Sequence, residues 1–177
     1  MKILILAGGP NRHGSSNLLA DEFIRGAREA GHTVAVIDAA HADLHPCAGC
    51  VRRGYEGPCV RKDDMEAFRR QILSADMLVF VTPLYYYGMS AQLKTPVDRF
   101  CAINSSIMRR HMKSALLAAA WNADDWTFEA LVAHYKTLVR YLDLDDRGMV
   151  PGKGCGTPVM TARSRYPKQA YALGRQL

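Results

Sequence analysis

The sequence lacks any long hydrophobic run. Its first apolar segment, Ile3–Ala7, ends at Gly8-Gly9, which is too early for the core of a signal peptide. No other stretch approaches the length of a membrane span. The sequence also lacks internal repeats, low-complexity tracts and linkers. We therefore expect a single cytoplasmic domain that covers residues 1–177 and has no membrane partner.

The sequence also lacks a concentrated charge of one sign. A formal net charge of +6 leaves an anionic partner open, but the basic residues form short pairs, such as Arg52-Arg53 and Arg109-Arg110, among acidic and apolar residues. Such dispersed pairs are typical of a solvated surface. A hydrophobic content of 49% with 23% charged residues is ordinary for a folded protein. We expect no nucleic-acid partner.

The glycine-rich turn after the first apolar run lacks both common nucleotide-binding motifs. A dinucleotide fingerprint that starts at Gly8 needs two further glycines, but those places hold Pro10 and His13. The spacing of a Walker A loop is present up to Gly14, but Ser15 stands where the phosphate-binding lysine must be. Both motifs are excluded.

What the turn does contain suits a compact monophosphate. A helical pattern follows from Leu19 to Ala27, so the turn joins the carboxyl end of a strand to the start of a helix. A helix start presents unpaired backbone N–H groups and a partial positive charge to an anion. Arg12, Ser15, Ser16 and Asn17 add a guanidinium and short polar side chains. The turn therefore favours a terminal phosphate such as that of FMN; the alternative is an ordinary capped turn.

Buried-strand and helical patterns alternate along the rest of the chain. Further strands are predicted at Thr33–Ile37, Met77–Thr82, Ser114–Ala120 and within Gly148–Gly154. Helices are predicted after the caps Asp63 and Asp64, over Ala91–Phe100, around Leu131–Leu142 and in a short segment from Pro167. This alternation predicts an α/β fold: a doubly wound, five-stranded parallel sheet with helices on both faces. Its ligand is expected beyond the carboxyl ends of the strands.

Three consecutive tyrosines, Tyr85, Tyr86 and Tyr87, follow the third predicted strand. Neighbouring side chains on a strand or helix point in different directions, so the three rings cannot all face a core. Beside Pro83 and Gly88, flat rings can form a wall for a planar heterocycle while backbone amides bind its edge. The alternative is an aromatic surface used for dimerisation.

Two segments give the chain a resemblance to the flavodoxin-like NAD(P)H-dependent FMN reductase family. The run Arg12-His13-Gly14-Ser15-Ser16-Asn17 is similar to the family's Arg-x-x-Ser-x-Asn loop. Pro83–Gly88, followed by Lys94 and Asp98-Arg99, resembles its Pro-x-Tyr…Gly…Lys…Asp-Arg segment. The resemblance covers Met1 to about Tyr141. Gly9 stands where the family usually has Ser, which removes one hydroxyl donor.

The resemblance implies a flavodoxin-like fold, FMN as cofactor and hydride transfer from NADH or NADPH to a small-molecule acceptor. That acceptor would be a quinone, a free flavin, a nitro or azo compound, or a metal chelate. No catalytic acid, base or nucleophile is expected, because the flavin supplies the chemistry. The family also implies a homodimer or homotetramer. The implied cofactor-binding residues are Gly9, Asn11, Arg12, Ser15, Ser16, Asn17, Pro83, Leu84, Tyr85, Tyr86, Tyr87, Gly88 and Trp121.

Five cysteines without a secretory signal indicate reduced thiols. Three of them share one loop: Cys47, Cys50 and Cys59. Related iron–sulfur flavoproteins carry four cysteines here, but Arg53 replaces one, so Cys101 or Cys155 would have to be recruited from far away. Zinc would have His41 and His45 as further ligands, at irregular spacing. We expect no metal, and a dithiol sensor, a substrate-contacting loop or a packed loop without chemistry.

Three further functions stay open at this point. A flavodoxin-type electron carrier would share the fold, although flavodoxins are usually acidic and this chain is basic. An iron–sulfur flavoprotein would need a complete set of thiolates. A regulatory protein that has lost its flavin would explain the glycine at position 9.

Overall fold

A sheet of five parallel strands forms the centre of the computed structural model, which describes residues 1–50 and 59–177. The strands are β1 (Lys2–Ala7), β2 (Thr33–Asp38), β4 (Met77–Pro83), β5 (Lys113–Ala119) and β6 (Asp145–Gly152). Their order across the sheet is β2-β1-β4-β5-β6, and every neighbouring pair is parallel. This order is that of a flavodoxin-like doubly wound sheet, which confirms the predicted fold class.

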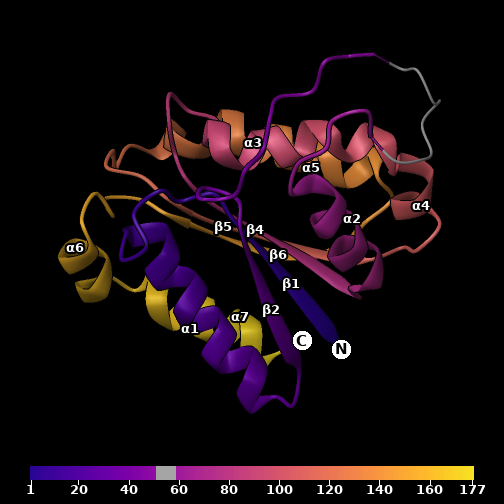
Figure 1. Cartoon of the computed structure of the whole chain (residues 1–177). Helices are drawn as coiled ribbons and strands as arrows, with labels where there is room; N and C mark the ends of the chain where they lie inside the picture. The colour runs from indigo at the N-terminus through magenta and orange to yellow at the C-terminus, as the bar shows by residue number, and fades with distance from the viewer. Residues whose placement is uncertain (51–58) are drawn as a thin grey trace.

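Helices cover both faces of the sheet (Figure 1). One layer holds α1 (Ser15–Glu29), α6 (Pro158–Arg163) and α7 (Tyr166–Arg175). The other holds α2 (Met65–Ser74), α3 (Ala91–Asp98), α4 (Asn104–Met108) and α5 (Glu129–Tyr141), with the short 3₁₀ turns η1 (Arg99–Ala102) and η2 (Asp125–Phe128). In the described parts of the chain, no helix is both long and apolar enough to cross a membrane.

Two apolar cores hold these layers on the sheet. Ile3 and Ile5 of β1 pack with Phe23 of α1 in one core. Leu4 and Leu6 point to the opposite face and join the core beneath α2, α3 and α5. Because both faces of the strand are buried, its sequence is a continuous apolar run instead of an alternating one. Burial of each such side chain contributes about 1.5–3 kcal/mol to folding.

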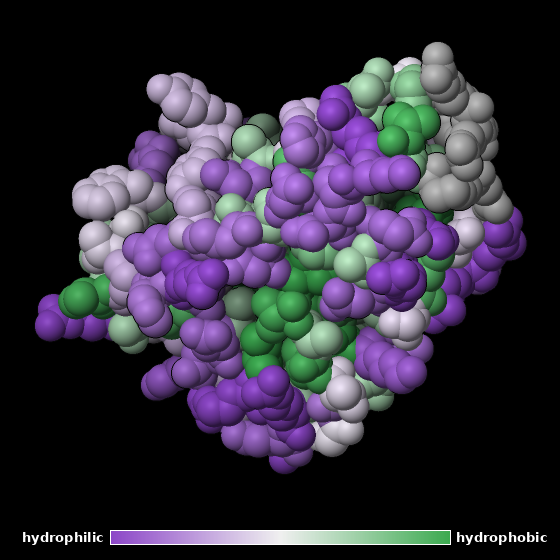
Figure 2. Space-filling view, in the orientation of Figure 1, coloured by the Kyte–Doolittle hydropathy of each residue, from purple (hydrophilic) through white to green (hydrophobic). Residues whose placement is uncertain are grey.

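The edge strand β2 is less covered than the central strands. Val36 is exposed, and most residues of β2 retain contact with solvent. Figure 2 shows apolar side chains gathered at the centre of this face, over β2, between hydrophilic surfaces of the flanking helices.

The structure corrects the predicted boundaries at three places. β6 begins at Asp145, before the predicted range, because its first residues are exposed and polar and give no buried-strand pattern. The predicted helix Ala91–Phe100 divides into α3 and η1 at Arg99. The polar C-terminal segment contains α6 in addition to the predicted last helix.

The contact between α1 and α7 depends on two glycines. A Cβ atom at Gly26 would lie 2.2 Å from the backbone oxygen of Tyr171, and one at Gly174 would lie 2.2 Å from that of Phe23. Neither backbone can move away from such a Cβ atom unless the two helices separate. The two helices therefore pack closely only because both positions lack a side chain.

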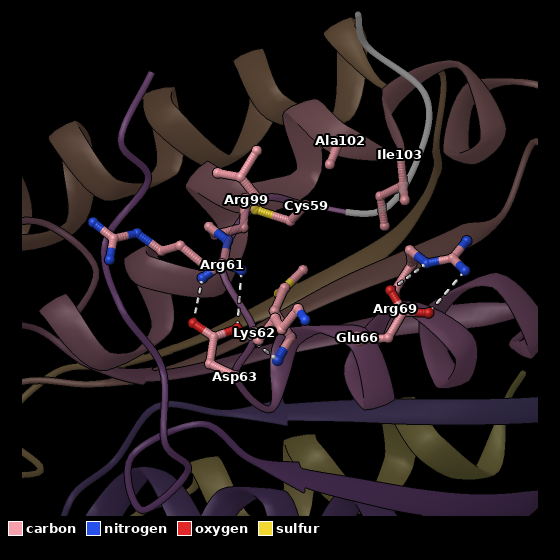
Figure 3. Close-up of a pocket in the computed structure, with 11 residues that line it drawn as sticks. Cys59, Arg61, Lys62, Asp63, Glu66, Arg69, Arg99, Ala102 and Ile103 are labelled. Atoms are coloured by element: carbon pink, nitrogen blue, oxygen red, sulfur yellow. Dashed lines mark hydrogen bonds and ion pairs between the residues drawn. The ribbon is translucent and has the colours of Figure 1, made fainter. Parts of the chain in front are cut away.

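A buried ion pair fastens the long loop between β2 and α2 to the rest of the protein. The side chains of Asp63 and Arg99 are each only 1% exposed. Arg99 Nη1 and Nη2 donate to the two carboxylate oxygens of Asp63 at 2.7 and 2.9 Å (Figure 3). Nη1 also donates to the backbone oxygen of His45 at 2.9 Å. The backbone N–H of Met65 donates to Asp63, which partly confirms its predicted capping role. Asp64 makes no side-chain cap, and its carboxylate accepts from the backbone of the loop instead.

Replacement of Asp63 by Asn should destabilise the fold by about 3 kcal/mol, because it leaves the charge of Arg99 buried without its partner. The hydrogen bonds from Arg99 hold the pKa of the Asp63 carboxyl well below its ordinary value near 3.8. The pair therefore stabilises the protein above that ordinary value and loses its contribution as the pH falls below it.

Urea unfolding of the wild type and of Asp63→Asn at pH 7 and at acid pH measures both effects. The difference in unfolding free energy should shrink as the pH falls from about 5. Asp64→Asn, at the exposed neighbouring carboxylate, is the matched control and should change stability by less than about 0.5 kcal/mol. Equal stability of the Asp63 and Asp64 variants at pH 7 would contradict the assignment.

Candidate functional site

A pocket of about 320 Å³ opens at the carboxyl ends of the strands. The loop between β1 and α1 forms one side, and the segments that follow β4, β5 and β6 form the others. β1 and β4 are neighbours in the sheet although β2 lies between them in sequence, so the chain changes its direction of winding here. Ligands of doubly wound proteins bind at such a switch point.

One end of the pocket has the character of an anion site. Ser15 and Ser16 begin α1, and both line the pocket. The Ser15 hydroxyl is buried and has no hydrogen-bond partner within the described residues. The helix start is capped by no side chain, so its backbone N–H groups are also available. An unpaired buried hydroxyl beside a helix N-terminus fits a phosphate group.

The absence of a side chain at Gly9 has a local explanation. A Cβ atom at this position would lie 2.8 Å from Ser16 Oγ. The Ser16 hydroxyl therefore occupies the space into which a serine at position 9 would extend.

Asn17 and Asn11 shape the loop. The Asn17 side-chain amide donates to the backbone oxygens of Gly9 at 3.3 Å and Asn11 at 2.8 Å. The Asn11 side-chain oxygen accepts from the backbone N–H of His13 at 3.0 Å. Asn11 also lines the pocket, whereas Asn17 lies outside its lining.

Arg12 lies beside the pocket but not in its lining. Its side chain is 69% exposed, and Nη2 lies 3.6 Å from a carboxylate oxygen of Asp38 at the end of β2. The same carboxylate contacts His41 Nδ1 at 2.8 Å. The structure therefore pairs the guanidinium with a protein carboxylate instead of bringing it to the two serines.

The predicted aromatic residues divide between two neighbouring hollows. Pro83, Leu84 and Tyr85 line the pocket together with Trp121. Tyr86 and Tyr87 lie around a second hollow of about 260 Å³, which shares Leu84 and Trp121 with the first. Gly88 lines neither hollow and instead closes the turn by exchanging backbone hydrogen bonds with Tyr85 at 3.0 and 3.2 Å.

The tyrosine turn holds two residues in an unfavourable backbone conformation. Tyr86 and Tyr87 have φ angles of 44° and 64°, in the left-handed region that costs a residue with a side chain roughly 1–2 kcal/mol. Tyr86 is fully exposed, and the ring of Tyr87 lies 4.9 Å from that of Trp126. This conformation directs the rings outward, which a regular strand end would not do.

Hydrogen bonds connect the tyrosine turn to the loop between β1 and α1. Ser90 Oγ donates to the backbone oxygen of Gly8 at 2.7 Å and accepts from the backbone N–H of Leu93, where it caps α3. The backbone N–H of Ser90 donates to Thr82 Oγ1 at 2.9 Å. Sequence reasoning missed both hydroxyls, although a serine before the helical pattern at Ala91 is a capping signal.

Sequence reasoning also missed the wall that follows β6. Cys155, Gly156 and Pro158 line the pocket, but no motif marks this segment. A Cβ atom at Gly156 would lie 2.1 Å from the Trp121 ring. Glycine at this position therefore lets the ring rest against the backbone and form part of the pocket wall.

A third cavity, which we call the cysteine-side cavity, has a volume of about 440 Å³ and lies between the segment that begins at Cys59 and the C-terminal end of α3 (Figure 3). Cys59 and Arg99 line it together with Ala102 and Ile103. Cys101 belongs to η1, and its sulfur lies 3.8 Å from that of Cys47. The prediction that Cys101 is remote from the loop was therefore wrong, because the ion pair of Asp63 brings the loop to η1.

A metal site is not formed by the described side chains. They contain no group of three or more His, Cys, Asp or Glu residues that could hold a metal ion.

Comparison with known proteins identifies relatives that are described as flavoproteins or FMN-containing oxidoreductases. The curated ones include an iron–sulfur flavoprotein of Methanocaldococcus jannaschii, 34% identical over 99 residues that make up 56% of this chain and 51% of the relative. A candidate NAD(P)H-dependent FMN-containing oxidoreductase of Bacillus subtilis is 31% identical over 104 residues, 56% of this chain and 52% of the relative. The chain spans about half the length of the curated relatives it matches.

Solved structures with the same fold cover nearly the whole chain. The NAD(P)H:quinone oxidoreductase of Methanothermobacter marburgensis has a TM-score of 0.79 at 21% identity, over 99% of this chain and 95% of that one. An FMN-dependent NADH-azoreductase of Bacillus anthracis, solved in complex with FMN, has a TM-score of 0.73 at 16% identity, over 99% and 98%.

The family profile extends over both predicted motif segments and the sheet strands β1 to β5. It matches residues 1–144 of the 177. The chain therefore belongs to the family of NADPH-dependent FMN reductases.

Proposed function

We propose that the protein is an FMN-dependent oxidoreductase that takes hydride from NADH or NADPH and passes electrons to a small organic acceptor. The observation that carries this proposal is the pocket at the switch point, where an unpaired buried hydroxyl at a helix start faces an aromatic wall. Membership of the FMN reductase family supports it. FMN, when bound, would supply hydride acceptance and electron transfer.

The chain's own residues would bind and orient the cofactor. Ser15 and Ser16 would donate to the phosphate together with the backbone N–H groups at the start of α1. Pro83, Leu84 and Tyr85 would lie against the ring system and exclude water from one side of it. Trp121, which is largely exposed, would cover part of the opening.

Arg12 has a smaller role in this proposal. Its guanidinium is exposed and shares its charge with Asp38. A surface charge of this kind contributes less to binding than a buried donor, because water screens it. We propose that Arg12 attracts the phosphate to the loop without contacting it in the way Ser15 does.

The acceptor class follows from the openness of the aromatic side. The rings of Tyr86 and Trp121 are exposed beside the pocket, so a flat quinone, flavin, or nitro or azo compound could stack there. The names of the quinone and azo reductases of the same fold agree with such acceptors.

The cysteines of the described residues are free thiols, which suits a reducing compartment, so we propose that the protein is cytoplasmic.

Ser15→Ala should weaken FMN binding by about 1.5–3 kcal/mol, the contribution of a hydrogen bond to a charged group. Its stability without FMN should be unchanged, since the hydroxyl has no partner within the described residues. Arg12→Ala should weaken binding by less than about 1 kcal/mol. Titration of FMN into the apoproteins measures both, with His13→Ala as the control in the same loop. A larger loss for Arg12→Ala than for Ser15→Ala would reverse the assignment.

The purified protein should show a flavin absorption spectrum and oxidise NADH or NADPH when a quinone or azo dye is present. Steady-state assays with each nucleotide test this directly. A flavodoxin-type carrier would bind FMN and accept electrons from a reductase, but it would not oxidise the nucleotides itself. Colourless protein that FMN cannot reconstitute would instead support the regulatory alternative.

The exposed aromatic residues around the second hollow also support a homodimer. Tyr86 projects fully into solvent, Trp121 is largely exposed beside it, and the half-exposed Trp126 lies against Tyr87. Aromatic residues that protrude together are typical of the centre of an interface. Tyr86→Ser should therefore raise the dimer dissociation constant at least tenfold in analytical ultracentrifugation. Tyr141→Ser, at an exposed tyrosine of α5, is the control. A wild-type protein that is monomeric at all concentrations would remove the dimer.

A further inference from the structure

Cys47 and Cys101 come from distant parts of the sequence and meet at the surface. Cys47 belongs to the loop after β2, and Cys101 belongs to η1 after α3. Their sulfur atoms lie 3.8 Å apart, and both residues are exposed. The two sulfur atoms are therefore in contact with each other and accessible to a dissolved oxidant.

The buried ion pair sets this meeting. Arg99 lies two residues before Cys101 and binds both Asp63 and the backbone oxygen of His45. His45 in turn lies two residues before Cys47. The guanidinium of Arg99 therefore holds together two segments, and each of them carries a cysteine two residues further along the chain.

The other cysteines are less well placed. Cys59 lies beside Arg99 and lines the cysteine-side cavity, and Cys155 is buried at the pocket at the switch point. Cys50 and Cys59 are close enough to help raise the pKa of the Cys101 thiol, but within the described part of the chain the two sulfur atoms in contact are those of Cys47 and Cys101. Two thiolates are half of the four ligands that a zinc or iron–sulfur site requires. The geometry thus suits a two-thiol reaction better than a metal site.

We propose that Cys47 and Cys101 form a redox-active dithiol that closes reversibly into a disulfide by exchange with a low-molecular-weight disulfide such as glutathione disulfide. The Cys47 thiolate attacks glutathione disulfide, forms a mixed disulfide and releases one glutathione. Cys101 then loses its proton, attacks the Cys47 sulfur and releases the second glutathione. The two protein thiols give up two electrons and two protons, and one glutathione disulfide becomes two glutathione molecules.

The order of these steps follows from the surroundings of Cys101. Desolvation, together with the hydrogen bond to Cys47, raises the pKa of the Cys101 thiol to about 11. Cys101 is therefore a protonated thiol at neutral pH, and a protonated thiol is a poor first nucleophile. Cys47 attacks first, and Cys101 resolves the mixed disulfide.

The disulfide would tie the segment of Cys47 to η1, two neighbours of which, Arg99 and Ala102, line the cysteine-side cavity. Cys59–Asp63 supplies one wall, and Arg99, Ala102 and Ile103 supply the other. In the reduced protein the ion pair of Asp63 and Arg99 joins these walls, and the oxidised protein would add a covalent bond nearby, between Cys47 and η1. The loop would thereby respond to the thiol–disulfide balance of its compartment.

The test is to equilibrate the purified protein with glutathione buffers of graded redox ratio, block free thiols and map disulfides by mass spectrometry without reduction. Trypsin is expected to release Cys47 in peptide 29–52 and Cys101 in peptide 100–109. We expect these two peptides to be linked in most chains in the oxidising buffers and to separate after dithiothreitol. Because Cys50 shares the first peptide, the Cys50→Ser variant assigns the bond and should still form it. Cys101→Ser should abolish the link.

Three results would overturn the proposal: a Cys47–Cys50 bond in place of the link, glutathione that remains on Cys47 with Cys101 free, or stoichiometric zinc or iron bound to cysteines in anaerobically purified protein. The peptide map does not depend on flavin or on turnover. Its outcome is therefore separate from that of the proposed oxidoreductase function.

Discussion

The reversal of winding at β1 is the constraint on which the pocket depends. The chain leaves β1 for β2 on one side and then returns across to β4 on the other side of β1. Right-handed crossovers then place α1, which follows β1, and α3, which follows β4, on opposite faces of the sheet, so the segments that leave these two strands diverge. Because these two segments lead to opposite faces of the sheet, no described connection between strands crosses the space between them. Ser90 keeps the separation fixed, because its hydroxyl binds the backbone of Gly8 while it caps α3.

The second fixed point of the molecule is the pair of Asp63 and Arg99. A buried ion pair adds little net stability compared with apolar residues of the same volume, because both charges lose their hydration. Its value here is positional: the bidentate contact and the bond to the backbone of His45 accept one arrangement of the loop. The loop has few apolar residues to specify its path, so a polar contact of defined geometry does so instead.

Much of the fold could be predicted because β1, β4 and β5 are buried on both faces and therefore carry continuous apolar runs. β6 was placed less accurately, since an exposed edge strand that begins with Asp145 and Asp146 has no such pattern. The turn before α1, with Ser15 and Ser16 at the start of the helix, could be located because local sequence creates both the turn and the helix start. Arg12 and Cys101 could not be placed, because their partners Asp38 and Cys47 come from other strands and loops. Contacts of that kind arise from tertiary folding and leave no local signal.

The glycine contact between α1 and α7 limits how the sequence can change during evolution. No residue is smaller than glycine, so a larger side chain at Gly26 cannot be compensated by a change at Gly174, and the reverse is also true. The two positions can vary only if the helices cross elsewhere. α7 supplies no residue to the pocket at the switch point, yet it supports the helix whose first turn carries Ser15 and Ser16. Selection that preserves Ser15 and Ser16 at the start of α1 therefore also limits how far the sequence of α7 can change, because α7 packs against the other end of α1.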